Sequence, residues 1–395
     1  MKLANRTTKI EASPTLAISA KAAQMKKQGI PIIDFGVGEP DFDTPENIKQ
    51  AGIKAIQEGF TKYTPAAGMP ALKEAICEKL KKENGLEYTP AQVIVSCGAK
   101  HALYNIMIAV LESGDDALLP APYWVSYPEQ IKLADANVVV IDTQEANDFK
   151  MTATELKRAI TPKTKLLILN SPSNPTGCVY TKKELETIAE ICVDKKIIVV
   201  SDECYEKNVY DGEKHISIAS LGKEIFDLTI VVNAVSKTYS MTGWRIGYAA
   251  GPADVVKAMS EIQSHATSNP TSFAQKGAIE AFKGPQESVG IMIAEFDKRR
   301  KALVDGLNSI PGVSCRVPKG AFYAFPNVSG LYGKTFSGKV IKNSMDLTAY
   351  LLEVAQIAVV PGSPFGADNY LRFSYATAMK NVVEGVERFK KAVIF

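Results

Sequence analysis

The stretch IIVVSDECY, residues 197–205, decides the fold because four β-branched apolar residues run directly into Ser201 and Asp202. A short run of this kind is typical of a strand buried inside a parallel sheet. A carboxylate at the end of such a strand is costly unless a cation or a hydrogen-bond donor meets it. The stretch therefore predicts both a parallel sheet and a partner for Asp202.

Similar runs recur on both sides of this stretch, between about residues 90 and 250, and they alternate with segments of helical periodicity. One such segment, KKELETIAEICVDKK (182–196), has apolar residues at helical spacing and cations in its last turn. This alternation is the pattern of crossover units, so we predict an α/β core with a parallel sheet. The other runs are VIVS (93–96), ALLP (117–120), VVVI (138–141), LLILN (166–170) and IVVNAVS (230–236).

The residues that end these runs are the candidate site, because ligands of open parallel sheets bind beyond the carboxyl ends of the strands. The first run ends in SCGAK (96–100), where we expect the N–H groups of Gly98, Ala99 and Lys100 to face the cleft and to suit a phosphate. Close packing of a strand against a helix would explain these small residues equally well. The fourth run continues into NSPSNPTG (170–177), whose prolines either aim Asn174 into the cleft or support a simple Asx-turn.

Asp202 and Lys237 end two of the runs, so they could form an internal ion pair or hold a cofactor between them. Burial disfavours the ammonium form of a lysine and leaves an amine that can condense with an aldehyde. A carboxylate beside a pyridine nitrogen keeps that nitrogen protonated, so both groups suit pyridoxal 5′-phosphate. Its phosphate could bind the turn at 98–100 together with Ser236 and Arg245.

Composition excludes several other classes of protein. The chain has 395 residues with 46 basic and 43 acidic side chains, a net charge of +3 that gives no reason to expect a nucleic-acid partner. No apolar run approaches a membrane span and the start has no signal-peptide pattern, so we expect a cytoplasmic protein. The six cysteines and three histidines show no metal-binding spacing, and no G-x-G-x-x-G follows a strand. We therefore expect neither a metal nor a dinucleotide.

The sequence pattern changes near residue 286, where a charged helical segment is followed by short segments typical of strands. The arm up to about residue 45 is rich in Gly, Pro and Asp and is predicted to be loop. We expect an N-terminal arm at 1–45 that joins the small domain, a large cofactor-binding domain at 46–285 and a small α+β domain at 286–395.

Taken together, the motifs resemble those of the class I, fold type I pyridoxal-phosphate aminotransferases, and among them the bacterial aspartate aminotransferase subgroup. The resemblance runs from end to end. It implies a large domain with a mainly parallel seven-stranded sheet between helices, plus a smaller α+β domain. The motifs are GVGEPDFDTP (36–45), TKYTPAAGMPALKEAI (61–76), CGAKHAL (97–103), PYWVSYP (122–128), NSPSNPTG (170–177), SDECY (201–205), SKTYSMTGWRIGY (236–248), TSNPTSFAQ (267–275), GAFY (320–323), VVPG (359–362) and LRFSYA (371–376).

The resemblance also implies roles for individual residues. Lys237 would bond covalently to the cofactor, Asp202 would pair with its ring nitrogen, and Tyr205 and Asn174 would bind its phenolate oxygen. Trp124 would stack on the ring, although a tryptophan in the core is the commoner use of this residue type. The remaining matches are Arg372 for the substrate α-carboxylate, Gly38 for close approach to the substrate, and Tyr63 and, with less support, Asn269 for contacts across a homodimer with shared active sites.

The implied activity is a ping-pong transfer of the α-amino group of L-aspartate or L-glutamate to 2-oxoglutarate or oxaloacetate, with Lys100 binding the distal carboxylate. Prephenate, aromatic or other amino acids remain alternative substrates, although Glu11 stands near a position where relatives that use prephenate carry a base, and Lys9 lies two residues earlier. Ala99 also departs from a hydroxyl residue of the wider class. A C–S β-lyase on the same scaffold and a cofactor-binding sensor without catalysis stay open.

Overall fold

The structure, a computed structural model, describes residues 3–11 and 14–394. Its largest element is a seven-stranded sheet with the order β2-β8-β7-β6-β5-β3-β4. All neighbouring strands are parallel except β8, which is antiparallel to both β2 and β7. The strands are β2 (Val93–Ser96), β3 (Asp116–Ala121), β4 (Asn137–Asp142), β5 (Thr164–Asn170), β6 (Ile198–Asp202), β7 (Thr229–Ala234) and β8 (Gly247–Ala250).

Helices bury both faces of this sheet because successive strand residues point to opposite sides. On β5, Leu166 and Ile168 pack with α4, α5 and α10, whereas Leu167 and Leu169 pack with α6, α7 and α8. These helices are α4 (Ala99–Val110), α5 (Ser126–Leu133), α6 (Ala153–Ala159), α7 (Lys182–Lys195), α8 (Lys223–Leu228) and α10 (Ala253–Ala266); α2 (Glu46–Gln57), α3 (Pro70–Lys79) and α11 (Ser272–Lys283) cover the β2–β8 edge.

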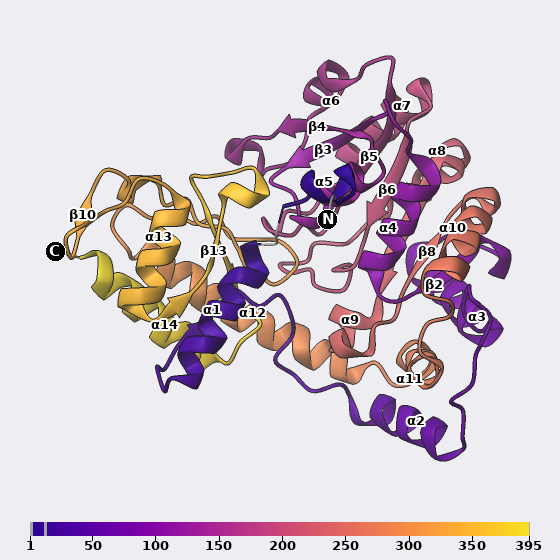
Figure 1. The fold of residues 1–395 in the computed structure, drawn as a ribbon, viewed down its shortest axis with the longest axis horizontal. Coiled ribbons are helices and arrows are strands. Elements are labelled where there is room, and N and C mark those ends of the chain that lie inside the picture. Colours follow the sequence, from indigo (N-terminus) through magenta and orange to yellow (C-terminus); the bar gives the residue numbers. More distant parts are fainter. Residues whose placement is uncertain (1–2, 12–13, 395) are drawn as a thin grey trace.

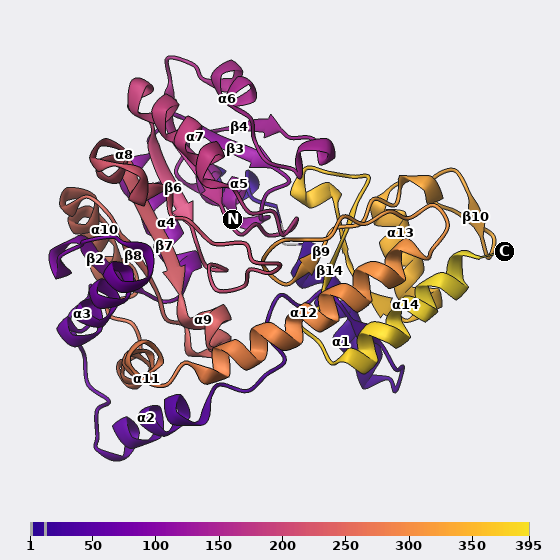
Figure 2. The same cartoon turned by 180° about the vertical axis from the view of Figure 1, so that it is seen from behind.

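The C-terminal elements form a second lobe, and the long helix α12 (Glu287–Asn308) runs from the sheet into it (Figures 1 and 2). A three-stranded sheet with the order β13-β14-β9 lies in this lobe, and β1 of the N-terminal arm pairs in parallel with β12. The elements are β1 (Ile33–Asp34), β9 (Tyr323–Ala324), β10 (Thr335–Phe336), β11 (Lys339–Val340), β12 (Ile357–Ala358), β13 (Val360–Pro361), β14 (Leu371–Ser374), α13 (Ser344–Tyr350) and α14 (Met379–Val393).

Two local predictions were wrong. The arm was expected to be loop, but it contains the helix α1 (Pro14–Lys27) and the strand β1. The strand β8 was not expected, because its sequence GYAA lacks the run of Val, Ile or Leu that marks the other strands. Packing against distant parts of the chain stabilises both elements. Ile33 and Phe35 of the arm join the core of the C-terminal lobe, and β8 is buried between two strands.

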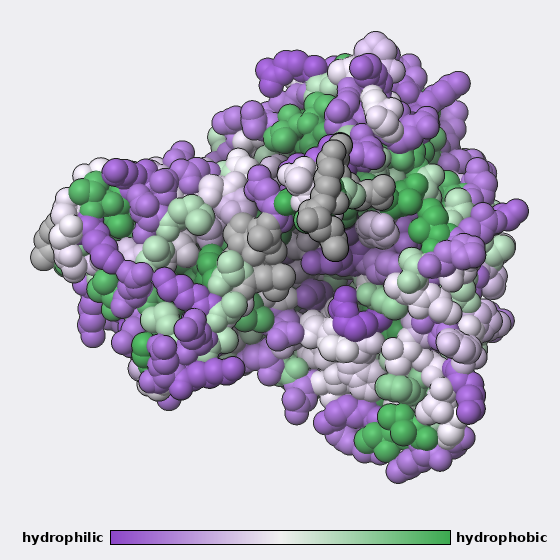
Figure 3. All heavy atoms as spheres, viewed as in Figure 1, coloured by the Kyte–Doolittle hydropathy of each residue, from purple (hydrophilic) through white to green (hydrophobic). Residues whose placement is uncertain are grey.

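The surface is mixed, as its charge balance predicts. Hydrophilic side chains cover most of the face in Figure 3, and hydrophobic ones form small separate groups. One hydrophobic group lies over α2, where Ile53 and Ile56 are exposed. Within the described ranges, no helix has the length and apolar character needed to cross a bilayer.

Candidate active site

A cavity of about 520 Å³ lies where β5, β6 and β7 end and where the two lobes meet. Side chains far apart in the sequence come together on its wall, as the strand-end argument predicts. The predicted residues that line it are Gly38, Ala99, Lys100, Trp124, Asn174, Asp202, Tyr205, Ser236, Lys237, Arg245 and Arg372.

Asp202 is buried and is held by donors rather than by a cation. The hydroxyl of Tyr127 donates to its Oδ2 at 2.8 Å, and the backbone N–H of Cys204 donates to its Oδ1 at 3.1 Å. Burial raises the pKa of this carboxyl. No ion pair joins Asp202 to Lys237 among the described residues, so the ion-pair alternative is wrong and Asp202 stays available to a ligand.

Lys237 lies on the short helix α9 (Val235–Thr238), directly after β7. Its Nζ donates to the carbonyl of Gly38 at 2.5 Å and lies 5.8 Å from the ring centroid of Phe322. Burial lowers the pKa of this lysine to about 8. A neutral amine is therefore accessible near neutral pH, as condensation with an aldehyde requires.

One end of the cavity offers donors suited to a phosphate. Because α4 begins at Ala99, the N–H groups of Ala99 and Lys100 lie in its first turn, where the helix has no carbonyl to accept them. Arg245 is held there by the carbonyls of Thr242, at 2.9 Å, and Cys97, at 3.2 Å. Neutral oxygens thus fix the guanidinium group without neutralising it.

Gly98 differs from its prediction. Its N–H donates to the carbonyl of Ser96 at 2.7 Å, because the chain turns tightly between β2 and α4, so this group is not free for a ligand. The glycine is needed for another reason: φ is +87°, and a Cβ would lie 2.4 Å from Nη2 of Arg245. Gly98 therefore makes room for the arginine.

The opposite end of the cavity contains Arg372 on β14, which is only 3% exposed. Its Nη1 donates to Oδ1 of Asn174 at 3.1 Å and its Nη2 to the carbonyl of Gly36 at 2.7 Å, while its Nε has no partner. Burial lowers the pKa of Arg372, and no carboxylate contacts it among the described residues. A buried guanidinium without an anion is poised to bind one.

Aromatic side chains complete the wall. Nζ of Lys100 lies 4.8 Å from the ring centroid of Trp124, and Trp124 in turn meets Tyr127 edge-on at 5.3 Å. The hydroxyls of Tyr205 and Tyr323 are 2.8 Å apart. Gly38 is needed beside them, since a Cβ there would lie 2.6 Å from the Tyr323 hydroxyl.

Besides Gly98, two predicted residues do not line this cavity. Tyr63 follows α2 and is 90% exposed, and Asn269 donates to the carbonyl of Pro270 at 2.7 Å. Both were predicted to act across a homodimer interface, so their roles remain predictions.

Sequence reasoning assigned no role to Tyr127, Tyr323, Asn170 and Cys204, which also line the cavity. Asn170 ends β5 and donates to the backbone carbonyl of Asp202 at 3.0 Å. Tyr127 and Tyr323 stand in the motifs PYWVSYP and GAFY, and Tyr127 lies three residues after Trp124. Those motifs were the available signal, but only the folded chain shows which partner each hydroxyl has.

These features fit pyridoxal 5′-phosphate. The cavity combines an amine of lowered pKa, a buried carboxylate, and an arginine beside open N–H groups. Its volume is in the range of about 300–1,000 Å³ that is usual for cofactor sites.

Comparison with known proteins decides the family. The model of the family described as aminotransferase class I and II matches residues 30–389. The chain belongs to this family. It is a pyridoxal-phosphate-dependent aminotransferase of fold type I, and the predictions of family, fold class, cofactor and enzyme class are confirmed.

Individual relatives of this aminotransferase match over nearly their whole length. An aspartate aminotransferase of Bacillus sp. strain YM-2 is 51% identical over 391 residues, covering 99% of each chain. A probable aspartate/prephenate aminotransferase of Aquifex aeolicus is 48% identical over 393 residues, covering 99% of this chain and 98% of the relative. The structure of the Thermus thermophilus aspartate aminotransferase with maleate superimposes with a TM-score of 0.93 and 40% identity, covering 99% of this chain and all of the other.

Proposed function

We propose that this aminotransferase takes L-aspartate or L-glutamate as amino donor and 2-oxoglutarate or oxaloacetate as acceptor. One observation carries the proposal: two cations, Arg372 and Lys100, line the cavity that contains Lys237, and neither pairs with a carboxylate of the described residues. A dicarboxylic substrate has two anionic groups, and each cation can bind one of them. The named relatives support the same substrate class.

The residues have distinct tasks in this proposal. The bound cofactor supplies an aldehyde that condenses with amines and a ring that withdraws electrons from the substrate α-carbon. Asp202 holds the proton on the ring nitrogen, and Arg372 orients the substrate through its α-carboxylate. Nζ of Lys237 takes the proton from the α-carbon and returns it during transfer.

The substrate class is tested with Lys100→Met. We expect kcat/KM for L-aspartate and L-glutamate to fall about 10²-fold through loss of one charge-assisted contact, with little change for L-alanine or L-phenylalanine. Lys132→Met is the matched control, because this lysine pairs with Glu129 and does not line the cavity that contains Lys237; all its rates should stay within about twofold. An equal loss for alanine in Lys100→Met would contradict the proposal.

Prephenate is the second candidate, favoured by the name of the Aquifex relative. In this chain the N–H of Glu11 donates to the Glu129 carboxylate at 2.9 Å, and Lys9 pairs with Asp135. Glu11, which lines a second cavity together with Lys100, is an acid, and the base Lys9 is already paired. We expect a kcat/KM for prephenate below that for the dicarboxylic acceptors, which an acceptor panel measures directly. The same assays detect a C–S lyase as pyruvate released from cystathionine without an acceptor.

We also propose a homodimer with shared active sites. Tyr63 and the α2 residues Ile53 and Ile56 are exposed on one part of the surface, and such apolar groups favour association. Light scattering should give twice the 42.8 kDa chain mass. A monomer that retains full activity would contradict this assembly.

The expected division at residues 45 and 285 is likewise proposed, supported by the pairing of β1 with β12. The cytoplasmic location stays a prediction.

A further inference from the structure

The turn at residues 202–206 has two faces. Asp202 and Tyr205 line the cavity, whereas Glu203 and Glu206 do not and are 0% and 7% exposed. The turn is tight, since the N–H of Glu206 donates to the carbonyl of Glu203 at 2.9 Å. A displacement of either carboxylate would therefore move the backbone that carries Asp202 and Tyr205.

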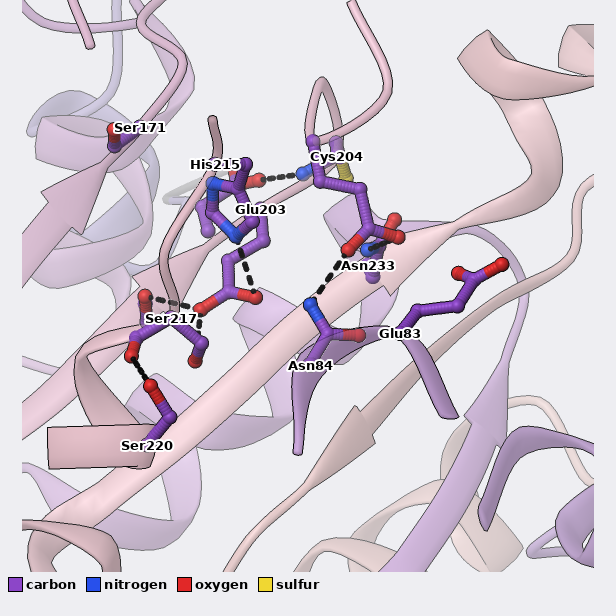
Figure 4. Close-up of polar contacts among 12 residues, drawn as sticks. Glu83, Asn84, Ser171, Glu203, Cys204, His215, Ser217, Ser220 and Asn233 are labelled. Carbon is purple, nitrogen blue, oxygen red and sulfur yellow. Dashed lines mark hydrogen bonds and ion pairs between the residues drawn. The ribbon is translucent and has the colours of Figure 1, made fainter. Parts of the chain in front are cut away.

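Glu203 does not line the cavity, and donors on neighbouring residues surround its carboxylate (Figure 4). Its Oε1 accepts from the hydroxyls of Ser201, at 2.8 Å, and Ser217, at 2.6 Å. Nε2 of His215 lies 3.1 Å from its Oε2, and the His215 side chain is almost wholly buried. Ser201 is the last residue before Asp202, so the contacts of Glu203 with Ser201, Ser217 and His215 fix the end of β6.

Glu206 is held more strongly, by an ammonium group and two amides. Lys79 of α3 pairs with its Oε1, which also accepts from Nδ2 of Asn233 at 2.8 Å. Nδ2 of Asn84 donates to its Oε2 at 2.9 Å. Burial opposes the charge on Glu206, but Lys79, His215 and Asn84 together lower its pKa to about 2.

The same contacts reach the strand that carries Lys237. Asn233 lies on β7, four residues before Lys237, and the N–H of Glu203 donates to the carbonyl of Val232 at 2.8 Å. One group of buried contacts thus joins the ends of β6 and β7 with α3. It spans the strands that deliver Asp202 and Lys237 to the cavity.

These side chains also have a spacing that could hold a cation, since ligand atoms of Glu203, Glu206 and His215 lie within 4.8 Å of one another. The ammonium of Lys79 already supplies a positive charge to Glu206, and both carboxylates are satisfied by donors. A metal ion would have to displace that ammonium, so we assign no metal here.

Stability alone does not account for two buried carboxylates at this place. Apolar side chains of similar volume would fill the space without desolvating charges, and such replacements are often neutral or stabilising. Hydrogen bonds to several fixed donors are directional, so they fix the orientation of the turn, which apolar packing does not.

We propose that Glu203 and Glu206 are positioning residues for the cofactor. They hold the turn at 202–206 from behind, so that Asp202 and Tyr205 keep their places on the cavity wall. Lys79, Asn84 and Asn233 anchor Glu206, and Ser217 and His215 anchor Glu203. The inference rests on the cofactor roles proposed for Asp202 and Tyr205.

The two carboxylates should differ in sensitivity. In Glu206→Gln one oxygen becomes an NH₂ group, which must face either Lys79 and Asn233 or the amide of Asn84. A donor then faces a donor in either orientation, and the ammonium cannot become an acceptor. In Glu203→Gln the hydroxyls of Ser201 and Ser217 can rotate to accept instead. We therefore expect Glu206→Gln to have the larger effect.

The test measures the dissociation constant of pyridoxal phosphate from the apoprotein, the absorption maximum of the bound cofactor, kcat and KM for the amino donor, and the melting temperature of the apoprotein. For Glu206→Gln we expect the dissociation constant to rise and kcat to fall by about tenfold, with a shifted absorption band and KM within about twofold. For Glu203→Gln we expect the same changes at about threefold.

The matched control is Asp116→Asn, a buried carboxylate at the start of β3 that accepts from Thr161 and Asn137. It should lower the melting temperature and leave the dissociation constant and absorption band unchanged. If Glu206→Gln behaves like this control, the two glutamates are merely structural and the proposal is wrong.

Two further variants keep the test decisive. If Glu206→Gln fails to fold, Asn84→Ala removes one donor from Glu206 at a partly exposed position, and an unchanged dissociation constant and absorption band would overturn the proposal. Asp202→Asn tests the underlying assignment. If Asp202→Asn also leaves the dissociation constant and the absorption band unchanged, the proposed role of Asp202 is wrong, and the positioning role of Glu203 and Glu206 is not what failed.

Discussion

Arg372 and Arg300 are both buried arginines, but their guanidinium groups have opposite surroundings. Arg300, on α12, is 0% exposed and pairs with both oxygens of Asp211 at 2.8 Å and with Asp297. Arg372, on the cavity wall, donates to two neutral oxygens and lies over the rings of Tyr323 and Phe365, while its Nε has no partner among the described residues. The pKa of Arg300 is raised, since its carboxylate contacts outweigh burial, whereas burial lowers that of Arg372.

The difference separates cations that hold the fold from cations that await a ligand. A buried charge with its anion in place belongs to the architecture, whereas one held by neutral oxygens is incomplete until an anion arrives. Lys237 belongs to the second class, since its Nζ donates to a backbone carbonyl and pairs with no carboxylate within the described ranges.

The largest effect expected is that of Lys237→Ala. Removing the amine deletes both the covalent attachment and the proton carrier, so we expect kcat to fall by at least about 10⁴-fold. Borohydride reduction, followed by mass spectrometry, should label the wild type and not the variant. Normal turnover in the variant would show that Lys237 lacks the assigned role.

The arginine comparison itself is tested with matched lysine substitutions. Arg372→Lys should lower kcat/KM on the order of 10²-fold, because an ammonium cannot make the two-pronged contact, with little change in melting temperature. Arg300→Lys should cost about 3 kcal/mol of unfolding free energy, because it weakens a buried pair, while leaving KM near that of the wild type. Denaturant titration and steady-state kinetics check both. A loss of stability in Arg372→Lys together with a loss of kcat/KM in Arg300→Lys would contradict the distinction between the two arginines.

A smaller effect follows from the pKa of Lys237, which burial lowers to about 8. Below that pH the free lysine of the apoprotein is an ammonium and cannot attack an aldehyde. Capture of pyridoxal phosphate should therefore accelerate about tenfold per pH unit up to pH 8 and level off above it. Stopped-flow absorbance measures the rate. A plateau reached only near pH 10.5 would mean that the amine is not perturbed.

The sequence predicted what local patterns encode. Short apolar runs marked six strands of the central sheet, and the residues at or just beyond their ends identified Asp202, Asn174 and Lys237. The strand β8 and the helix α1 were missed because their small or polar residues carry a weak local signal, and packing against distant elements stabilises them. Local patterns therefore find the strands that carry large apolar residues and miss elements that depend on contacts with distant parts of the chain.

The hydroxyl partners inside the site could not be predicted, because they join residues far apart in the chain. Tyr127 reaches Asp202 across 75 positions, and Tyr205 reaches Tyr323 across 118. The contacts of Glu206 with Lys79 and Asn233 are equally nonlocal. No spacing rule connects such pairs, and only the folded chain shows them.

The central claim is that the two unpaired cations of the cavity select a dicarboxylic amino donor. The most direct measurement is the half-reaction of the wild-type protein with bound cofactor, followed by absorbance as L-aspartate or L-alanine is added without an acceptor. We predict that L-aspartate converts the cofactor band completely and that 2-oxoglutarate reverses the conversion. The second-order rate constant for L-aspartate should exceed that for L-alanine by at least about 10²-fold. Equal rates for the two donors, or no change with L-aspartate, would contradict the account.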